Sequence, residues 1–178
     1  EGARDMMEGL LGDALEAGLI EDAAIAESEA QKAAMWKIRE SIPIAERVHG
    51  KALKHDVSVP VSRVHEFIDK ASAMVKSMNP GVDIIAFGHV GDGNIHYNIT
   101  SPQGADTDKF LEGEGLKISH AVHDMIWSLN GSISAEHGIG KLKRDELATR
   151  KPAVEMEMMR AVKKALDPQN RMNPGRVL

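Results

Sequence analysis

The order of strand-like and helix-like patterns in the middle of the chain constrains the fold more than any other feature. Residues 54–59 alternate in the manner of a strand and stop at Pro60, and apolar residues then recur at helical spacing over about 62–78. Four further elements follow: strands over 82–90 and 94–100, a helix over about 107–129, and a strand over 132–134. This β-α-β-β-α-β order predicts an α+β fold of the ferredoxin-like type, with an antiparallel sheet and helices on one of its faces.

Helices are also predicted before and after this core. On the N-terminal side we expect a helix over about 4–17 that ends at Gly18, a short strand over 19–26, and a helix from residue 29 to about 40 that Pro43 terminates. The C-terminal elements are two short helices, over about 141–149 and 152–166, and an extended end. We therefore divide the chain into three parts: a helix-strand-helix portion over 1–50, the ferredoxin-like core over 51–136, and a helical tail over 137–178.

Composition excludes several classes of function. The chain has 178 residues, enough to bury a core, and a net charge of -5, so we expect no nucleic-acid partner. It has no cysteine, which excludes disulfides, thiol nucleophiles and zinc sites built from cysteine. No apolar run is long enough for a transmembrane segment. We expect a location in the cytoplasm or at the inner face of a membrane as a peripheral protein.

The segment 87–98 carries most of the residues that favour chemistry. Asp92-Gly93 is typical of a two-residue type I′ hairpin turn, which would pair His89 with His96. Strand alternation then puts both histidines and Asn98 on one face, with opposed Cβ atoms about 4.5–5.5 Å apart, so that two imidazoles can bind one metal ion. The residues expected on the opposite, core face are Ala86, Val90, Ile95 and Ile99. The alternative, which the residues alone leave open, is an ordinary turn flanked by exposed histidines.

A second segment, 134–140, adds a carboxylate and another imidazole at the end of the last predicted strand. Two histidines and one carboxylate are a recurring ligand set for divalent metals, and three protein ligands leave a position open for substrate. Glu136 is the candidate carboxylate, and His137 is a candidate general base at neutral pH. The alternative is a solvated strand end followed by a glycine turn.

Other titratable residues give weaker indications of metal or anion binding. His120 and His123 share a helix face and form a rival metal pair, although an exposed helix surface is the simpler interpretation. Arg39 and Lys54 lie at the ends of predicted elements, where an anion could be bound, although a single cation is usually solvated. The histidines without an evident partner are His49, His55 and His65.

Five stretches, in the same order, resemble the C-terminal half of the FAD-linked D-2-hydroxy-acid dehydrogenases, flavoproteins of the vanillyl-alcohol-oxidase type. That group includes D-lactate and D-2-hydroxyglutarate dehydrogenases and the FAD subunit of glycolate oxidase. The matching stretches are 36–42, 54–60, 87–96, 134–140, and Asp167-Pro168 through 173–178. The resemblance implies FAD and a divalent metal, usually zinc, as cofactors.

The resemblance also implies roles for individual residues. His89, His96 and Glu136 match the metal ligands, and His137 matches the base that takes the hydroxyl proton while hydride passes to the flavin. The residues that match substrate and flavin contacts are Arg39, Lys54 and Asn98 for the substrate and Asn173 for the flavin.

The family's FAD-binding domain precedes this region, and nothing in the chain resembles it. We therefore expect a C-terminal fragment, inactive alone, of an enzyme that oxidises a D-2-hydroxy acid to the 2-oxo acid. Residues 1–50 would then belong to a truncated cap domain, and 137–178 would return to the missing FAD domain. Pro43 follows the Arg39 segment closely enough to alter substrate contacts, so the acid itself stays open, as do the electron acceptor and a homodimeric state. The alternative is a stand-alone ferredoxin-like module that binds a metal or small anion without catalysis.

Overall fold

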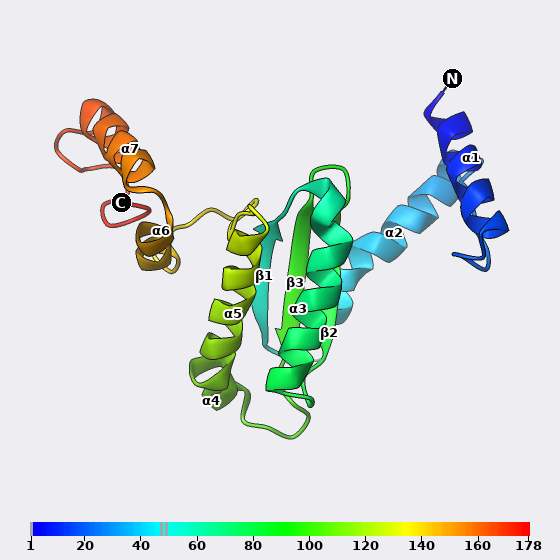
Figure 1. Ribbon diagram of the computed structural model, residues 1–178, viewed down its shortest axis with the longest axis horizontal. Coiled ribbons are helices and arrows are strands. Elements are labelled where there is room, and N and C mark those ends of the chain that lie inside the picture. The colour runs from blue at the N-terminus through cyan, green and yellow to red at the C-terminus, as the bar shows by residue number, and fades with distance from the viewer. Residues whose placement is uncertain (1, 47, 49) are drawn as a thin grey trace. The chain divides into compact units, whose positions relative to one another are not determined.

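The computed structural model describes residues 2–46, 48 and 50–178 (Figure 1). Two compact units make up the chain, one over 1–50 and one over 51–178. His49, for which the sequence suggested no partner, lies outside the described residues. No helix among the described residues combines the length and apolar character needed to cross a membrane.

The described part of the first unit contains the helices α1 (Ala3–Glu16) and α2 (Glu29–Glu46). The helix expected over 4–17 is thus confirmed, but the strand expected over 19–26 is wrong: this stretch is irregular, and Leu19 is largely exposed. Termination of the second helix at Pro43 is also wrong, because α2 continues through the proline to Glu46. A proline inside a helix removes one N–H from the bonding pattern and its ring crowds the carbonyl of the preceding turn, which can kink a helix without ending it.

The second unit is built on a three-stranded antiparallel sheet in the order β1-β3-β2 (Figure 1). Its strands are β1 (Ala52–Ser58), β2 (Ile84–His89) and β3 (Asn94–Thr100). The helical elements of the core are η2 (Val61–Arg63), α3 (Val64–Met78), α4 (Thr107–Glu112) and α5 (Glu114–Ser128). Figure 1 shows α3 and α5 side by side over one face of the sheet. The predicted α+β class, with helices on one face of an antiparallel sheet, is therefore confirmed.

Two elements of the core differ from the expected pattern. The last strand, expected over 132–134, is reduced to one antiparallel bridge between Ser58 and Ser132, whose backbone N–H and C=O groups bond reciprocally at 2.9 and 2.8 Å. The helix expected over 107–129 is divided into α4 and α5 at Gly113, whose ψ of -95° departs from helical geometry.

The hairpin between β2 and β3 has a longer turn than Asp92-Gly93 alone. His89 pairs with Asn94, and Phe87 pairs with His96, so the predicted pairing of His89 with His96 is wrong by two residues. The N–H groups of both Asp92 and Gly93 donate to the carbonyl of His89, which closes a four-residue loop over 90–93. A shift of two residues keeps His89, His96 and Asn98 on one face, as predicted, whereas a shift of one would reverse the faces.

The core lies between the sheet and the two long helices. Its largest fully buried side chains include Tyr97, Phe67, Ile99, Ile118 and Ile126. Burial of Ile95 and Ile99 agrees with the prediction. Ala86 and Val90 are exposed instead, because β2 is an edge strand and Val90 lies in the turn.

His55 also points into this core, where the sequence indicated no partner for it. The ring is 2% exposed, with Nδ1 2.8 Å from the carbonyl oxygen of Tyr97 and Nε2 3.0 Å from Oγ of Ser119. Burial, reinforced by the neighbouring His123, lowers the pKa of His55 to about 4. We conclude that this imidazole is a neutral core group.

The C-terminal segment contains α6 (Arg144–Arg150) and α7 (Ala153–Leu166). The chain then turns back, and the N–H of Val177 donates to the carbonyl of Gly140 at 2.9 Å. The end of the chain therefore lies beside the loop over 134–140.

Replacement of Gly93 in the hairpin loop should destabilise the fold. Its φ is +74°, and a Cβ atom there would lie 2.0 Å from the carbonyl oxygen of Val59. We expect Gly93→Ala to lower the free energy of unfolding by at least about 1–3 kcal/mol. Gly91→Ala is the matched control, because a Cβ atom there meets nothing within 4 Å. Chemical denaturation followed by circular dichroism measures both variants, and equal stabilities would contradict the described loop.

His55 should make stability fall in acid. The pKa of His55 is lowered on folding, so the unfolded chain binds the extra proton between pH 6.5 and about 4. The contribution of the neutral His55 ring to stability is fully present above pH 6.5. Below pH 6.5 we expect the free energy of unfolding to fall by up to about 1.4 kcal/mol per pH unit. His55→Gln should flatten this slope, and His65→Gln, on the exposed side of α3, should not. Denaturation experiments at pH 7.5, 6 and 5 measure the free energy of unfolding of wild type and both variants. Equal pH dependence in wild type and His55→Gln would argue against a neutral buried ring.

Candidate metal centre and active site

The candidate site lies on the face of the sheet opposite α3 and α5. Ile95, Tyr97 and Ile99 of β3 point into the core, so Asn94, His96 and Asn98 alternate onto the other face. On the neighbouring strand β1, Asp56 is paired with His96, and Lys54 with Asn98. Sheet pairing thus gathers side chains from two strands at one place.

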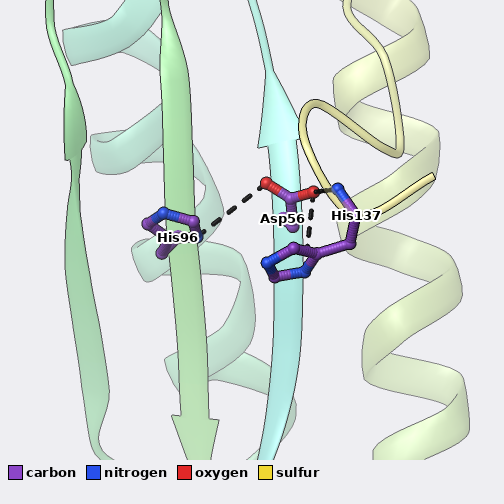
Figure 2. Close-up of side chains that lie close together, drawn as sticks. All are labelled: Asp56, His96 and His137. Carbon is purple, nitrogen blue, oxygen red and sulfur yellow. Dashed lines mark hydrogen bonds and ion pairs between the residues drawn. The ribbon is translucent and has the colours of Figure 1, made fainter. Parts of the chain in front are cut away.

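Asp56 attaches the loop over 134–140 to this face. Its Oδ2 accepts a hydrogen bond from the backbone N–H of Glu136 at 2.8 Å. The same oxygen accepts a second bond from the backbone N–H of His137 at 2.7 Å (Figure 2). Its own carbonyl accepts a third bond from the N–H of Ala135, at 3.2 Å. The two adjacent residues predicted as ligand and base are therefore held against β1.

The three residues predicted as metal ligands come together. Nε2 of His89 lies 3.5 Å from Oε1 of Glu136, and Nε2 of His96 lies 3.9 Å from Oε2. One ligand atom from each residue can be chosen so that all lie within 4.8 Å of one another. Ligands about 2.0–2.2 Å from a tetrahedral zinc are about 3.4 Å apart, so small side-chain movements would suffice to bind one ion. Asn94 donates from Nδ2 to Glu136 and so orients this carboxylate.

A second set of possible ligands, Asp56, His96 and His137, shares His96 with the first. Nδ1 of His96 lies 3.8 Å from Oδ1 of Asp56, and Nδ1 of His137 lies 3.6 Å from Oδ2 (Figure 2). However, Oδ2 already accepts two backbone bonds, and Asp56 is only 3% exposed. The first set is the better candidate for an accessible metal, because the side chains of His89 and Glu136 are each 46% exposed.

The surroundings set the charge states that metal binding needs. Burial alone would raise the pKa of Asp56, but the N–H groups of His137 and Glu136 outweigh it and leave the pKa lowered. Burial lowers the pKa of His96 despite the nearby carboxylates of Glu136 and Asp56. An ionised Asp56 beside a neutral His96 follows, and a neutral imidazole is the form that binds metals.

The residues predicted to contact substrate and flavin occupy different parts of the chain. Lys54 and Asn98 share the site's face, and Asn98 is 4% exposed. Arg39 lies on α2 in the first unit. Asn173 belongs to the C-terminal segment, where its carbonyl accepts a bond from the N–H of Arg176.

A cavity of about 510 Å³ lies next to the site. Asp56 and His137 form part of its wall. Its cationic lining residues are Lys54, Lys141, Lys143 and Arg176. This arrangement favours an anionic ligand beside the imidazole of His137.

The rival pair of histidines on α5, His120 and His123, differ in burial. His123 is 6% exposed, with Nδ1 2.9 Å from both carboxylate oxygens of Glu146 on α6, so the exposed surface expected for this residue is wrong. The expectation holds for His120, whose side chain is 63% exposed. The His123–Glu146 contact joins residues of two different helices, and no pattern near residue 123 indicates it.

Sequence reasoning missed two polar residues of the site, Asp56 and Asn94. Strand alternation could have identified Asp56, because it lies two residues from Lys54 and so shares its face. Its contacts with Glu136 and His137 join residues 80 and 81 positions away in sequence, and these depend on the tertiary fold.

The chain is similar to known proteins over nearly its whole length. The family model described as "FAD linked oxidases, C-terminal domain" matches residues 1–177. D-2-hydroxyglutarate dehydrogenase of Stutzerimonas stutzeri is 40% identical over 164 residues, which cover 92% of this chain and 35% of that protein. A mitochondrial D-2-hydroxyglutarate dehydrogenase of Arabidopsis thaliana is 35% identical over 175 residues, covering 98% of this chain and 30% of that protein.

A mitochondrial D-2-hydroxyglutarate dehydrogenase of Danio rerio is 32% identical over 168 residues, covering 94% of this chain and 30% of that protein. The chain thus spans about a third of the length of these relatives. The family resemblance expected from the five sequence stretches is confirmed. The chain belongs to the family of C-terminal domains of FAD-linked oxidases.

Proposed function

We propose that this chain is the substrate- and metal-binding part of an FAD-dependent enzyme that oxidises D-2-hydroxyglutarate to the corresponding 2-oxo acid. The observation that carries the proposal is the convergence of His89, His96 and Glu136, with His137 beside them. The family match supports FAD as the cofactor. The names of the relatives support the substrate.

The ligand chemistry suits a divalent metal such as zinc. Two imidazoles and one carboxylate, His89, His96 and Glu136, are a recurring zinc ligand set, and they leave a coordination position for a substrate oxygen. When bound, the ion supplies a Lewis acid that lowers the pKa of the substrate hydroxyl. Asn94 holds the Glu136 carboxylate toward the two imidazoles through its side-chain hydrogen bond.

His137 is the general base in this proposal. Its Nδ1 faces Asp56, which leaves Nε2 to accept the proton of the substrate hydroxyl. The side chain is 68% exposed, so a substrate can reach it. The flavin supplies the acceptor for the hydride from the α-carbon.

The substrate is a dicarboxylate, and the chain offers cations and an amide for it. Lys54 and Asn98 lie opposite each other on the site's face. The neighbouring cavity adds Lys141, Lys143 and Arg176. We assign Lys54, Asn98 and Arg39 to the substrate and Asn173 to the flavin, roles that rest on the sequence resemblance.

Removal of one imidazole should abolish metal binding. We expect the protein, produced as its gene encodes it, to retain stoichiometric divalent metal after dialysis, and His96→Ala to lose it because two ligands hold an ion weakly. His65→Ala, exposed on α3, is the control and should keep the metal. Elemental analysis measures the content. Equal metal in wild type and His96→Ala would exclude the assigned ligands.

Catalysis should require D-2-hydroxyglutarate, metal and His137 together. With an artificial electron acceptor, we expect the flavin-loaded protein, produced as its gene encodes it, to turn over the D enantiomer. This activity should be lost with a chelator and recovered with zinc. His137→Gln should lower kcat by about 10²–10⁴-fold because it removes the base, with metal and flavin contents unchanged. His65→Gln provides the matched control. If D-2-hydroxyglutarate fails to bleach the flavin of the wild type anaerobically, the substrate assignment is wrong.

A further inference from the structure

We propose that Asp56 is a positioning residue, which fixes the ring of His96 for metal binding and holds the Glu136–His137 backbone in place. The inference rests on the proposed function, because it concerns the same metal centre. Neither the sequence pattern nor the family resemblance gave Asp56 a role. Its assignment comes from the contacts of its two carboxylate oxygens.

One oxygen of Asp56 organises the loop. Oδ2 accepts two consecutive backbone N–H groups, those of Glu136 and His137, at 2.8 and 2.7 Å. Bonds to a carboxylate are stronger than bonds between neutral groups, and they satisfy an anion that is 3% exposed. Both the proposed ligand and the proposed base therefore depend on this one oxygen for the position of their backbone.

The other oxygen faces the shared imidazole. Among the described residues, Oδ1 is buried without a hydrogen-bond donor, and it lies 3.8 Å from Nδ1 of His96 (Figure 2). The opposite ring nitrogen, Nε2, lies 3.9 Å from Glu136. His96 is thus placed between two carboxylates, one facing each nitrogen.

This placement determines how His96 would bind a metal. A carboxylate beside Nδ1 favours the tautomer that carries its proton there, and Nε2 then presents a lone pair toward Glu136 and His89. Such carboxylate–histidine–metal arrangements orient the ring and make it a better ligand. In this arrangement Asp56 faces the ring nitrogen of His96 that does not bind the metal, and Glu136 provides a ligand oxygen on the metal side.

The same carboxylate faces the proposed base. Nδ1 of His137 lies 3.6 Å from Oδ2 of Asp56, and the rings of His96 and His137 stack with centroids 5.9 Å apart (Figure 2). Asp56 therefore couples the orientation of a ligand to that of the base. Loss of its charge should affect metal affinity and turnover together.

Asp56→Asn separates this role from a merely structural one. The asparagine carbonyl oxygen can replace Oδ2 and accept both backbone bonds, so the loop can stay in place. The amide nitrogen then replaces Oδ1 and presents a donor to Nδ1 of His96, which disfavours the required tautomer. Asp69→Asn, an exposed change on α3, is the matched control.

The experiment measures zinc affinity of the flavin-loaded protein, as its gene encodes it, by competition with a chromophoric chelator. We expect Asp56→Asn to weaken zinc binding by about 10–100-fold and to lower kcat/KM, with amide exchange at residues 136–137 unchanged. Asp69→Asn should match the wild type. Zinc affinity of Asp56→Asn within twofold of the wild type would overturn the inference while leaving the proposed function intact. A wild type that binds no divalent metal contradicts both.

A second measurement needs no substitution at Asp56. In zinc-loaded wild type, nitrogen NMR of the imidazoles, with the ring of His96 assigned through its own backbone signals, reports which nitrogen of His96 carries the proton. We expect a protonated Nδ1 and a metal-bound Nε2. The reverse assignment would overturn the inference even if Asp56→Asn failed to fold.

Discussion

The pairing of β3 with both of its neighbours is the constraint on which the site depends. Ile95, Tyr97 and Ile99 fill the core on one face of this central strand, and each buried side chain of this kind contributes about 1.5–3 kcal/mol. A slip of one residue would turn all three away from the core and turn the intervening polar side chains into it. The hydrophobic core therefore fixes the face on which His96 and Asn98 lie. Packing on one face of the sheet therefore positions the candidate site residues on the other face.

The hairpin shows which parts of such a site can be predicted from sequence. Alternation correctly put His89, His96 and Asn98 on one face, because the period of a strand is two and the observed shift is also two. The register itself was wrong because the Asp-Gly signal describes only local turn preference. In the structure, Gly93 also packs against Val59, a contact that depends on where β1 lies.

Long-range contacts account for what the sequence could not indicate. Asp56 meets the backbone of residues 136 and 137, and His123 meets Glu146 on another helix, across distances in sequence where no periodic pattern applies. Local patterns predicted most helices of the core to within a few residues. The errors at Pro43 and over 19–26 arose where a local signal was given more weight than the continuity of the helix or the need for a partner strand.

The two carboxylates of the site illustrate how burial can separate two roles for the same chemical group. Asp56 is 3% exposed, and the backbone N–H groups that donate to it lower its pKa despite this burial, which suits a group that orients others. The side chain of Glu136 is 46% exposed, and it meets an amide and two imidazoles. A carboxylate in that setting can move the short distance that binding an ion requires. A buried carboxylate and an exposed carboxylate therefore face opposite nitrogens of the His96 ring, at 3.8 and 3.9 Å.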